Sequence, residues 1–138
     1  MVEEARREVG EGGEGRVECR GYRVVDLETG EVYEESGELQ LFCPAPGGWL
    51  YVNFEDSSGV FSGASLEEAY RNLLRHAVKR EVEQVEEYCG KAEEALRGGD
   101  SAGYRLYASY CEEWLQYLEE SLRKLDRLRR GKLKVELI

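Results

Sequence analysis

The chain is poor in the residues that metal sites and nucleophilic active sites need. Histidine occurs once, at His76, and none of the four cysteines belongs to a C-x-x-C pair. Zinc sites use closely spaced Cys and His ligands, and Ser or Cys nucleophiles usually need a histidine base. We therefore expect no catalytic residue, no metal and no cofactor. We interpret His76 as a partly exposed side chain on a helix flank.

Long apolar runs are also missing. No stretch approaches the roughly 20 residues that a helix needs to cross a membrane. The first ten residues, MVEEARREVG, lack the apolar segment of a secretory signal peptide. We expect a cytoplasmic protein with no membrane partner.

Amides and methionine are scarce. Asn and Gln together number five, Met occurs only at position 1, Glu exceeds Asp and Arg exceeds Lys. Such a composition is typical of thermophile proteins, although a GC-rich genome produces part of the same bias. We hypothesise that the protein comes from a thermophile or from its virus.

What the chain has in quantity is charge and aromatic residues. Its 138 residues include nine Tyr and two Trp, enough apolar material for one folded domain. The net charge of −10 is uneven, because residues 1–65 carry five basic and 14 acidic side chains while residues 66–138 carry 14 and 15. An acidic first half repels phosphates, which argues against generic nucleic-acid binding.

One glycine motif near the N-terminus matches the G-x-G-x-x-G spacing of nucleotide-binding loops, at Gly10, Gly12 and Gly15. That loop must follow a strand and open a helix, whose N-terminus faces the pyrophosphate. Here it follows a charged segment and precedes a strand, and Glu11 and Glu14 would repel phosphate. We interpret residues 1–15 as a flexible charged tail.

The pattern over residues 16–63 predicts an antiparallel sheet of four to five strands. The alternation changes phase at Gly21, which suggests a bulge in one long strand. Glu28-Thr29-Gly30 predicts a hairpin turn with positive φ at the glycine. Residues 49–54, WLYVNF, are apolar on both faces, as in a central strand.

Two long helices follow, over residues 65–97 and 101–130, and the first opens with a Ser65–Glu68 capping box. Apolar residues recur every three or four positions in both, which predicts an antiparallel hairpin. On the first helix the expected seam is Leu66, Tyr70, Leu74, Val78, Val82, Val85, Cys89, Ala92 and Leu96. Residues 132–138 alternate as a final strand that returns to the sheet. The expected fold is α+β: one domain, residues 16–138, with the sheet packed on the hairpin.

Cys89 and Cys111 stand at similar distances from the helix–helix loop, so we expect them to be neighbours. They form either a disulfide or a reduced pair. Cys19 and Cys43 are interpreted as small buried side chains, with disulfide pairing left open.

Two sets of side chains are candidate interaction surfaces. The aromatic set is either core or an interface with a protein partner, including a second copy: Trp49, Tyr51, Tyr110 and Tyr117. The basic set either offsets the dipole of the second helix or meets an acidic partner: Arg123, Lys124, Arg127, Arg129 and Arg130, with Lys132 and Lys134 beyond them.

These observations favour a small non-enzymatic interaction or regulatory protein that forms a homodimer or binds another protein. The first alternative is an acidic inhibitor that imitates nucleic acid and occupies a DNA- or RNA-binding site. The second is an enzyme of unknown type, because glutamate doublets such as Glu86-Glu87 and Glu112-Glu113 are frequent. On a helix such doublets more often lie on a solvated face.

Overall fold

The computed structural model describes residues 18–55 and 59–138, and the chain divides into two compact units. The first unit comprises Met1–Leu73 and Arg127–Ile138, and the second comprises Leu74–Asp126. The glycine motif at Gly10–Gly15 and the predicted tail, residues 1–15, lie outside the described residues. Whether residues 16–138 fold as a single domain stays a prediction.

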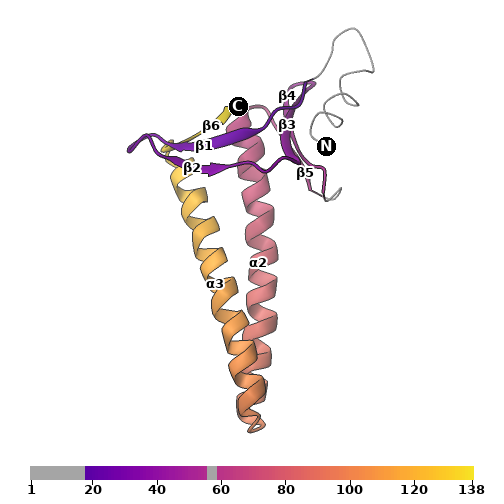
Figure 1. Ribbon diagram of the computed structural model, residues 1–138, viewed down its shortest axis with the longest axis vertical. Helices are drawn as coiled ribbons and strands as arrows, with labels where there is room; N and C mark the ends of the chain where they lie inside the picture. The colour runs from indigo at the N-terminus through magenta and orange to yellow at the C-terminus, as the bar shows by residue number, and fades with distance from the viewer. Residues whose placement is uncertain (1–17, 56–58) are drawn as a thin grey trace. The chain divides into compact units, whose positions relative to one another are not determined.

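The first unit contains two antiparallel three-stranded sheets, with strand orders β2-β1-β6 and β3-β4-β5 (Figure 1). The α+β class, the antiparallel strands and the C-terminal strand that joins the sheet are confirmed. The strands do not form the single sheet that we expected, however. Their bounds are β1 (Tyr22–Asp26), β2 (Val32–Glu35), β3 (Gln40–Ala45), β4 (Gly48–Asn53), β5 (Val60–Gly63) and β6 (Leu133–Leu137).

The division into two sheets occurs at Gly21. Arg20 and Phe42 exchange two backbone hydrogen bonds of 2.8 Å, whereas β1, from Tyr22 onward, pairs with β2 and β6. The predicted bulge at Gly21 is therefore wrong, because the chain passes here from one sheet to the other. A Cβ atom at Gly21 would lie 3.1 Å from the Ser36 hydroxyl, which accepts the Tyr22 N–H at 2.9 Å. The absence of a side chain lets the two segments approach closely.

Two sequence signals in the sheets are confirmed. Gly30 has a φ of 78° in the β1–β2 turn, where it donates its N–H to the Asp26 carbonyl oxygen at 2.7 Å. The apolar strand β4 is central, between β3 and β5. Tyr51 is the one buried side chain of β4, so the two apolar faces of this strand are not both fully covered.

Aromatic rings form the centre of the first unit. The rings of Tyr22 and Phe42 meet edge to face at 4.9 Å, those of Phe42 and Tyr51 at 5.6 Å, and those of Tyr22 and Tyr70 at 6.1 Å. All four side chains are at most 5% exposed. Edge-to-face pairs contribute about 0.5–1.5 kcal/mol each beyond the area that they bury.

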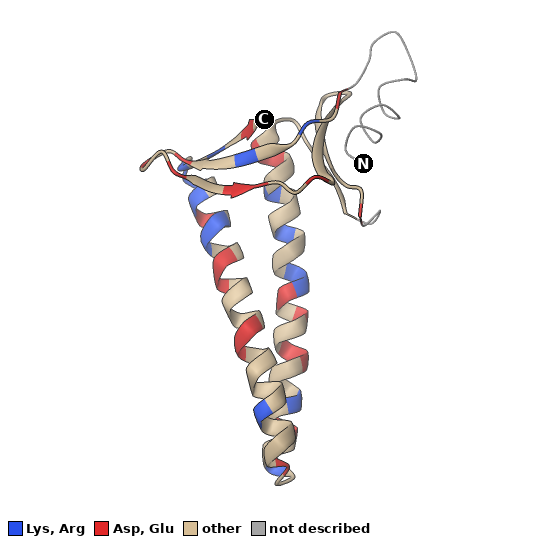
Figure 2. Ribbon diagram, viewed as in Figure 1, with Lys and Arg blue, Asp and Glu red and all other residues tan. Residues whose placement is uncertain are grey.

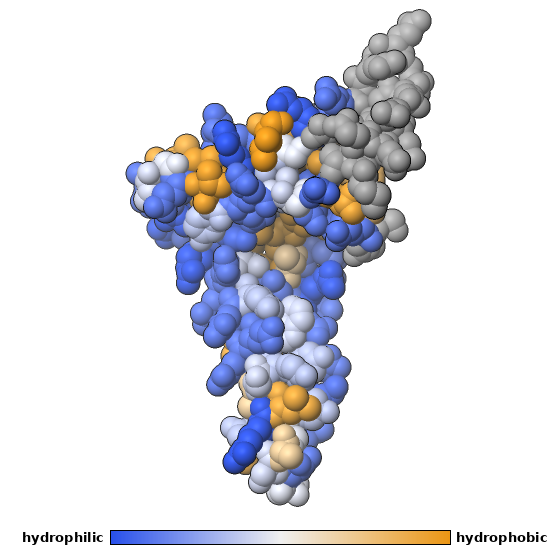
Figure 3. Space-filling view, viewed as in Figure 1, coloured by the Kyte–Doolittle hydropathy of each residue, from blue (hydrophilic) through white to orange (hydrophobic). Residues whose placement is uncertain are grey.

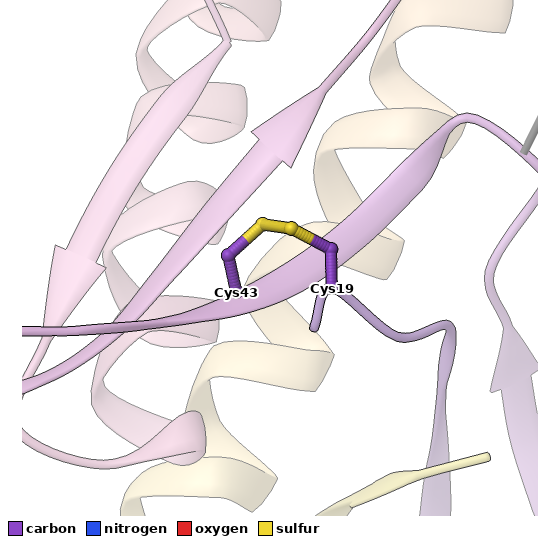
Figure 4. The surroundings of a disulfide bond; sticks show 2 residues. All are labelled: Cys19 and Cys43. Carbon is purple, nitrogen blue, oxygen red and sulfur yellow. A yellow bond between two sulfur atoms is a disulfide. The ribbon is translucent and has the colours of Figure 1, made fainter. Parts of the chain in front are cut away.

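A disulfide joins Cys19 to Cys43 of β3 beside this core (Figure 4). The two Cα atoms are 4.1 Å apart, and the residues are 0% and 5% exposed. They pack with Leu41 in a small apolar cluster. The disulfide therefore links β3 to the segment that leads into β1.

The helix α2 (Leu66–Arg97) begins with the predicted capping box. The Ser65 hydroxyl accepts the Glu68 N–H at 3.1 Å, and the Glu68 carboxylate accepts the Ala64 N–H at 3.2 Å. Both bonds satisfy N–H groups that have no partner within the helix.

The second unit is an antiparallel hairpin of α2 and α3 (Ser101–Arg129). Gly99, with a φ of 74°, ends α2, and the Asp100 carboxylate caps α3 by accepting the Gly103 N–H at 2.9 Å. The predicted seam is wrong at Val82 and Leu96, which are 36% and 61% exposed. Each four-residue step advances about 40° beyond a full turn, so a series of such steps leaves the buried face.

Candidate functional site

One face of the hairpin gathers aromatic side chains from both helices. We call this set the aromatic face: Tyr88 of α2 with Tyr107, Tyr110, Trp114 and Tyr117 of α3. The α3 residues are spaced by three, four and three positions, which places them on one side of a helix. The Tyr88 ring lies 6.4 Å from that of Tyr107 and 5.2 Å from that of Tyr110, and the rings of Trp114 and Tyr117 are 5.4 Å apart.

The cysteine pair of the hairpin lies directly beside these tyrosines. Cys89 and Cys111 are at disulfide-bonding distance, with Cα atoms 4.9 Å apart, so the prediction that they are neighbours is confirmed. Each follows a tyrosine of the aromatic face, Tyr88 or Tyr110, in the sequence. A bond here fixes the register of α2 against α3 at the level of the rings.

A cation covers the part of the aromatic face nearest the helix–helix loop. The Lys91 ammonium lies 5.4 Å from the ring centre of Tyr88 and 5.5 Å from that of Tyr107. Its Nζ atom is also 3.5 Å from the Glu87 carboxylate. Cation–π contacts at exposed sites contribute about 0.5–1 kcal/mol, which keeps the ammonium on the rings.

Much of this side of α3 is open to solvent. Leu106, Tyr110 and Tyr117 are 49%, 39% and 45% exposed, and they follow one another at intervals of four and seven residues. The space-filling view shows apolar side chains at the surface towards the loop end of the hairpin (Figure 3). Within the described residues, each of these three side chains keeps 39% or more of its surface exposed.

An open pocket of about 350 Å³ adjoins the aromatic face at Trp114 and is otherwise lined by Ala77, Arg80, Glu81 and Gln84. The Oε1 atom of Glu81 is buried and has no hydrogen-bond partner among the described residues. Burial raises the pKa of the Glu81 carboxyl, and a hydrogen bond with Ser121 offsets part of that effect. This buried oxygen can accept a hydrogen bond from a ligand or a partner side chain.

The structure places the four predicted aromatic residues in different units. Tyr110 and Tyr117 belong to the aromatic face, whereas Trp49 and Tyr51 lie on β4 of the first unit. Trp49 is half-buried, and Tyr51 is 5% exposed and packs in the aromatic core. Burial, with the negative charge of Glu34, raises the pKa of Tyr51 to about 12.

The basic set is also divided between the units, and charges are distributed along both (Figure 2). In the first unit Arg127 donates to Asp26 at 2.8 Å, and Lys132 lies 2.7 Å from Glu28. The backbone N–H of Glu28, followed by Arg127, lowers the pKa of Asp26. These cations therefore pair with acidic residues of their own unit.

The other basic residues have varied settings. Lys124, on α3 of the second unit, lies 4.0 Å from the Glu120 carboxylate. Arg123, Arg129 and Arg130 are exposed.

Sequence reasoning missed a partly buried polar cluster in the first unit. Glu34 of β2 accepts hydrogen bonds from Tyr70 at 2.7 Å and from Tyr22 at 3.3 Å. Burial and this carboxylate raise the pKa of both tyrosines. The tyrosines therefore stay protonated as donors, which makes the cluster a structural one.

Comparisons with known protein families, curated proteins and solved structures find no match. In the part of the chain that the structure describes, no group of three or more His, Cys, Asp or Glu side chains could hold a metal ion. Neither described helix is apolar enough over a sufficient length to cross a membrane. The surfaces of the two units are therefore the features that bear on function.

Sequence reasoning found two members of the aromatic face and missed the others. Among the residues to which it gave no role are Tyr88 and, beside the face, Glu81, both on α2. Their i, i+7 spacing on α2 is the signal that identifies them, since residues so spaced lie on one side of a helix.

Proposed function

We propose that this protein is a non-enzymatic interaction protein that forms a homodimer through the aromatic face. The observation that carries the proposal is the exposed stripe of Leu106, Tyr110 and Tyr117 on a helix held in register by a cysteine pair. Tyr and Trp bury large areas with few rotatable bonds, which is why they dominate the centres of protein interfaces. A pre-ordered helix face also reduces the entropy cost of association.

The charges around the face support a second copy as the occupant. Arg105 and Glu120 lie towards opposite ends of it along α3, about 14 and about 9 Å from the height of Trp114 at 1.5 Å per residue. Tyr110 and Tyr117 flank the same height. A twofold axis there would pair two α3 helices antiparallel, bring Tyr110 close to the second copy's Tyr117, and place Arg105 within about one helical turn of the height of the second copy's Glu120.

Two charged residues of α2, Lys91 and Glu81, lie at equal distances from the same height. Because Cys89 and Cys111 are adjacent, equal distances from them correspond to equal heights on the two helices. Lys91 and Glu81 then lie on either side of Trp114, so the twofold axis would direct Lys91 of one copy towards Glu81 of the other. The buried Glu81 oxygen, which has no described partner, would gain a donor. Opposite charges at both ends favour this antiparallel register.

Sedimentation equilibrium at micromolar concentrations tests the dimer. We expect the wild-type chain to sediment as a dimer and the Tyr110→Ser, Tyr117→Ser double variant to dissociate at least tenfold more readily. Leu122→Ser is the matched control, since Leu122 is 48% exposed on α3 but lies off the aromatic face. A wild-type chain that remains monomeric throughout would overturn the proposal.

A charge exchange tests the register. Arg105→Glu and Glu120→Arg should each weaken the dimer, because each places like charges together in the antiparallel arrangement. The double variant should restore association to near the wild-type level. Weakening by both single changes without restoration would exclude this pairing of the helices.

The setting that we propose is the cytoplasm of a thermophile or its virus. Two cysteine pairs at bonding distance are unusual in a mesophile's cytosol, but intracellular proteins of hyperthermophiles are an exception. The nucleic-acid-mimicking inhibitor and the enzyme stay predictions.

A further inference from the structure

The outer edge strands of the two sheets in the first unit differ in whether their outward backbone groups have hydrogen-bond partners. On β6, the Glu67 carboxylate accepts the Val135 N–H at 2.8 Å. On β5, the Asn72 side-chain amide donates to the Ser62 carbonyl oxygen at 2.7 Å. Both side chains come from the first turns of α2. Groups that an added strand would need are thus already occupied on these two edges.

The outer edge of β3 is also occupied. Arg20 forms a two-bond bridge with Phe42, and the disulfide between Cys19 and Cys43 anchors that segment alongside the strand. Three of the four outer edges therefore carry a bond from a side chain or from a neighbouring segment.

The fourth edge belongs to β2, which ends the order β2-β1-β6. No described strand pairs with the side of β2 that faces away from β1. Val32 is 48% exposed, and Glu31 and Glu35 are exposed on either side of it. The strand thus presents backbone N–H and C=O groups with no strand partner, next to accessible side chains.

The charged side chains of β2 and of the turns beside it have one sign, and the cation opposite Glu35 on β1, Arg23, is paired with Glu136 of β6. Residues 24–70 contain no Lys, Arg or His, a run that includes all of β2 and both turns beside it. Figure 2 shows β2 with acidic and no basic positions. Glu28 is paired with Lys132 and Glu34 with buried tyrosines, which leaves Glu31, Glu35 and Glu38 exposed towards solvent.

We propose that the outer edge of β2 binds an extended basic segment of another protein, which adds to the sheet as a strand. Strand addition takes its affinity from main-chain hydrogen bonds and its selectivity from alternate side chains. Lys or Arg opposite Glu31 and Glu35 would form favourable cross-strand pairs. A second copy of β2 would place glutamates against glutamates, so the same charges that resist self-pairing select a basic strand. The exposed Val32 offers an apolar contact beside them.

A designed peptide tests this site without any change to the protein. The probe is an acetylated and amidated octapeptide of alternating Lys and Val, together with an analogue N-methylated at every residue. The two carry the same charge, but the analogue keeps no backbone N–H in its eight residues on either edge, so only the first can pair fully as a strand. We expect the unmodified peptide to bind about tenfold more tightly or better and to slow hydrogen exchange of β2 amides. Equal affinities of the two peptides would mean that charge attraction alone causes binding, which would overturn the proposal. Failure of the unmodified peptide to bind would also overturn it.

Two variants locate the site. Glu31→Lys with Glu35→Lys should weaken binding of the Lys–Val peptide about tenfold or more and create binding of a Glu–Val peptide. Glu55→Lys, an exposed acidic position just after β4, is the matched control and should leave the affinity unchanged. The Tyr110→Ser, Tyr117→Ser variant should still bind the peptide, so failure of the dimer proposal and failure of this one are separate results. Loss of peptide affinity in Glu55→Lys equal to that at β2 would also contradict the site.

Discussion

The two units use the same residue type in opposite ways. In the first unit Tyr22, Tyr51 and Tyr70 are at most 5% exposed and form the core, whereas Tyr110 and Tyr117 of the second unit are 39% and 45% exposed. Two sheets and the helix turns beside them enclose a volume that aromatic rings fill. A hairpin of two helices has only one internal seam, so the rings that flank the seam remain at the surface. Tyrosine is therefore structural in one unit and available for binding in the other.

The hydroxyl groups show the same difference. Tyr70 donates to Glu34, which lies 36 residues away in the sequence, whereas Tyr117 donates at 2.8 Å to Glu113 one helical turn before it. The first bond joins α2 to β2 and the second stays within α3. Loss of a long-range bond between buried groups costs more stability than loss of an exposed local one.

The largest expected effect is the loss of folding stability when a cysteine pair is replaced, and it should differ between the two pairs. They close loops of similar length, with sequence separations of 24 and 22, so the entropy contributions to stability are nearly equal at about 3 kcal/mol. Cys19 and Cys43 also sit in the core, so their replacement by Ala should cost about 1 kcal/mol more than replacement of Cys89 and Cys111. Mass spectrometry of the unreduced, alkylated protein first establishes that both bonds exist.

Denaturant unfolding measures this difference, because each unit holds one tryptophan. Trp114→Phe leaves Trp49 to report on the first unit, and Trp49→Phe leaves Trp114 to report on the second. Equal losses for the two cysteine pairs would mean that core packing adds nothing to the Cys19–Cys43 link.

A smaller effect is expected from single hydroxyl groups. Tyr70→Phe should lower the free energy of unfolding by about 1–2 kcal/mol, because it removes a hydrogen bond to the Glu34 carboxylate in a buried setting. Tyr117→Phe should cost less than about 0.5 kcal/mol, since its bond is exposed and local. Thermal unfolding of the two variants under one set of conditions decides the comparison. A cost at Tyr117 that matches the cost at Tyr70 would contradict the contrast between the units.

The smallest expected effect is a pH dependence of the stability of the hairpin, caused by Glu81. Burial raises the pKa of Glu81 in the folded state, so the folded chain holds this proton more tightly than the unfolded chain. Stability from this group is present below the ordinary glutamate pKa and is lost as the pH rises through the raised value. In the Tyr110→Ser, Tyr117→Ser background, where no second copy brings Lys91 to Glu81, Glu81→Gln should therefore stabilise the fold at pH 7, by about 0.5 kcal/mol after solvent screening.

Urea unfolding across pH 4–8 checks the sign. The advantage of Glu81→Gln should shrink as the pH falls towards 4, where wild-type Glu81 is protonated. Glu83→Gln, an exposed change on the same helix, controls for net charge. An advantage that grows on acidification would show that burial does not dominate at Glu81.

Local signals in the sequence predicted the elements well. The Ser65–Glu68 capping box and the positive-φ Gly30 both lie where the sequence places them. Each of these features depends on groups within a few residues of one another, so the local sequence is sufficient. The adjacency of Cys89 and Cys111 was predictable for a related reason, since a short loop and a fixed rise per residue determine it.

Features that depend on distant segments were not predictable in this way. The phase change at Gly21 has two local explanations, a bulge and a passage between sheets, and only the pairing of Arg20 with Phe42 separates them. The helical pattern likewise failed to place Glu81 and Trp114 at one pocket, because an apolar repeat does not specify which side of α2 meets α3.

The sequence by itself determined the α+β class, the order of strands and helices, the turns between them and the uneven charge. Those properties follow from backbone propensity, hydrophobic period and composition, which neighbouring residues carry. Tertiary structure alone decided which tyrosines are buried, which sheet edges are capped and which side of the hairpin displays aromatic rings. Burial and edge pairing depend on segments as far apart as Glu67 and Val135, which only the folded chain brings together.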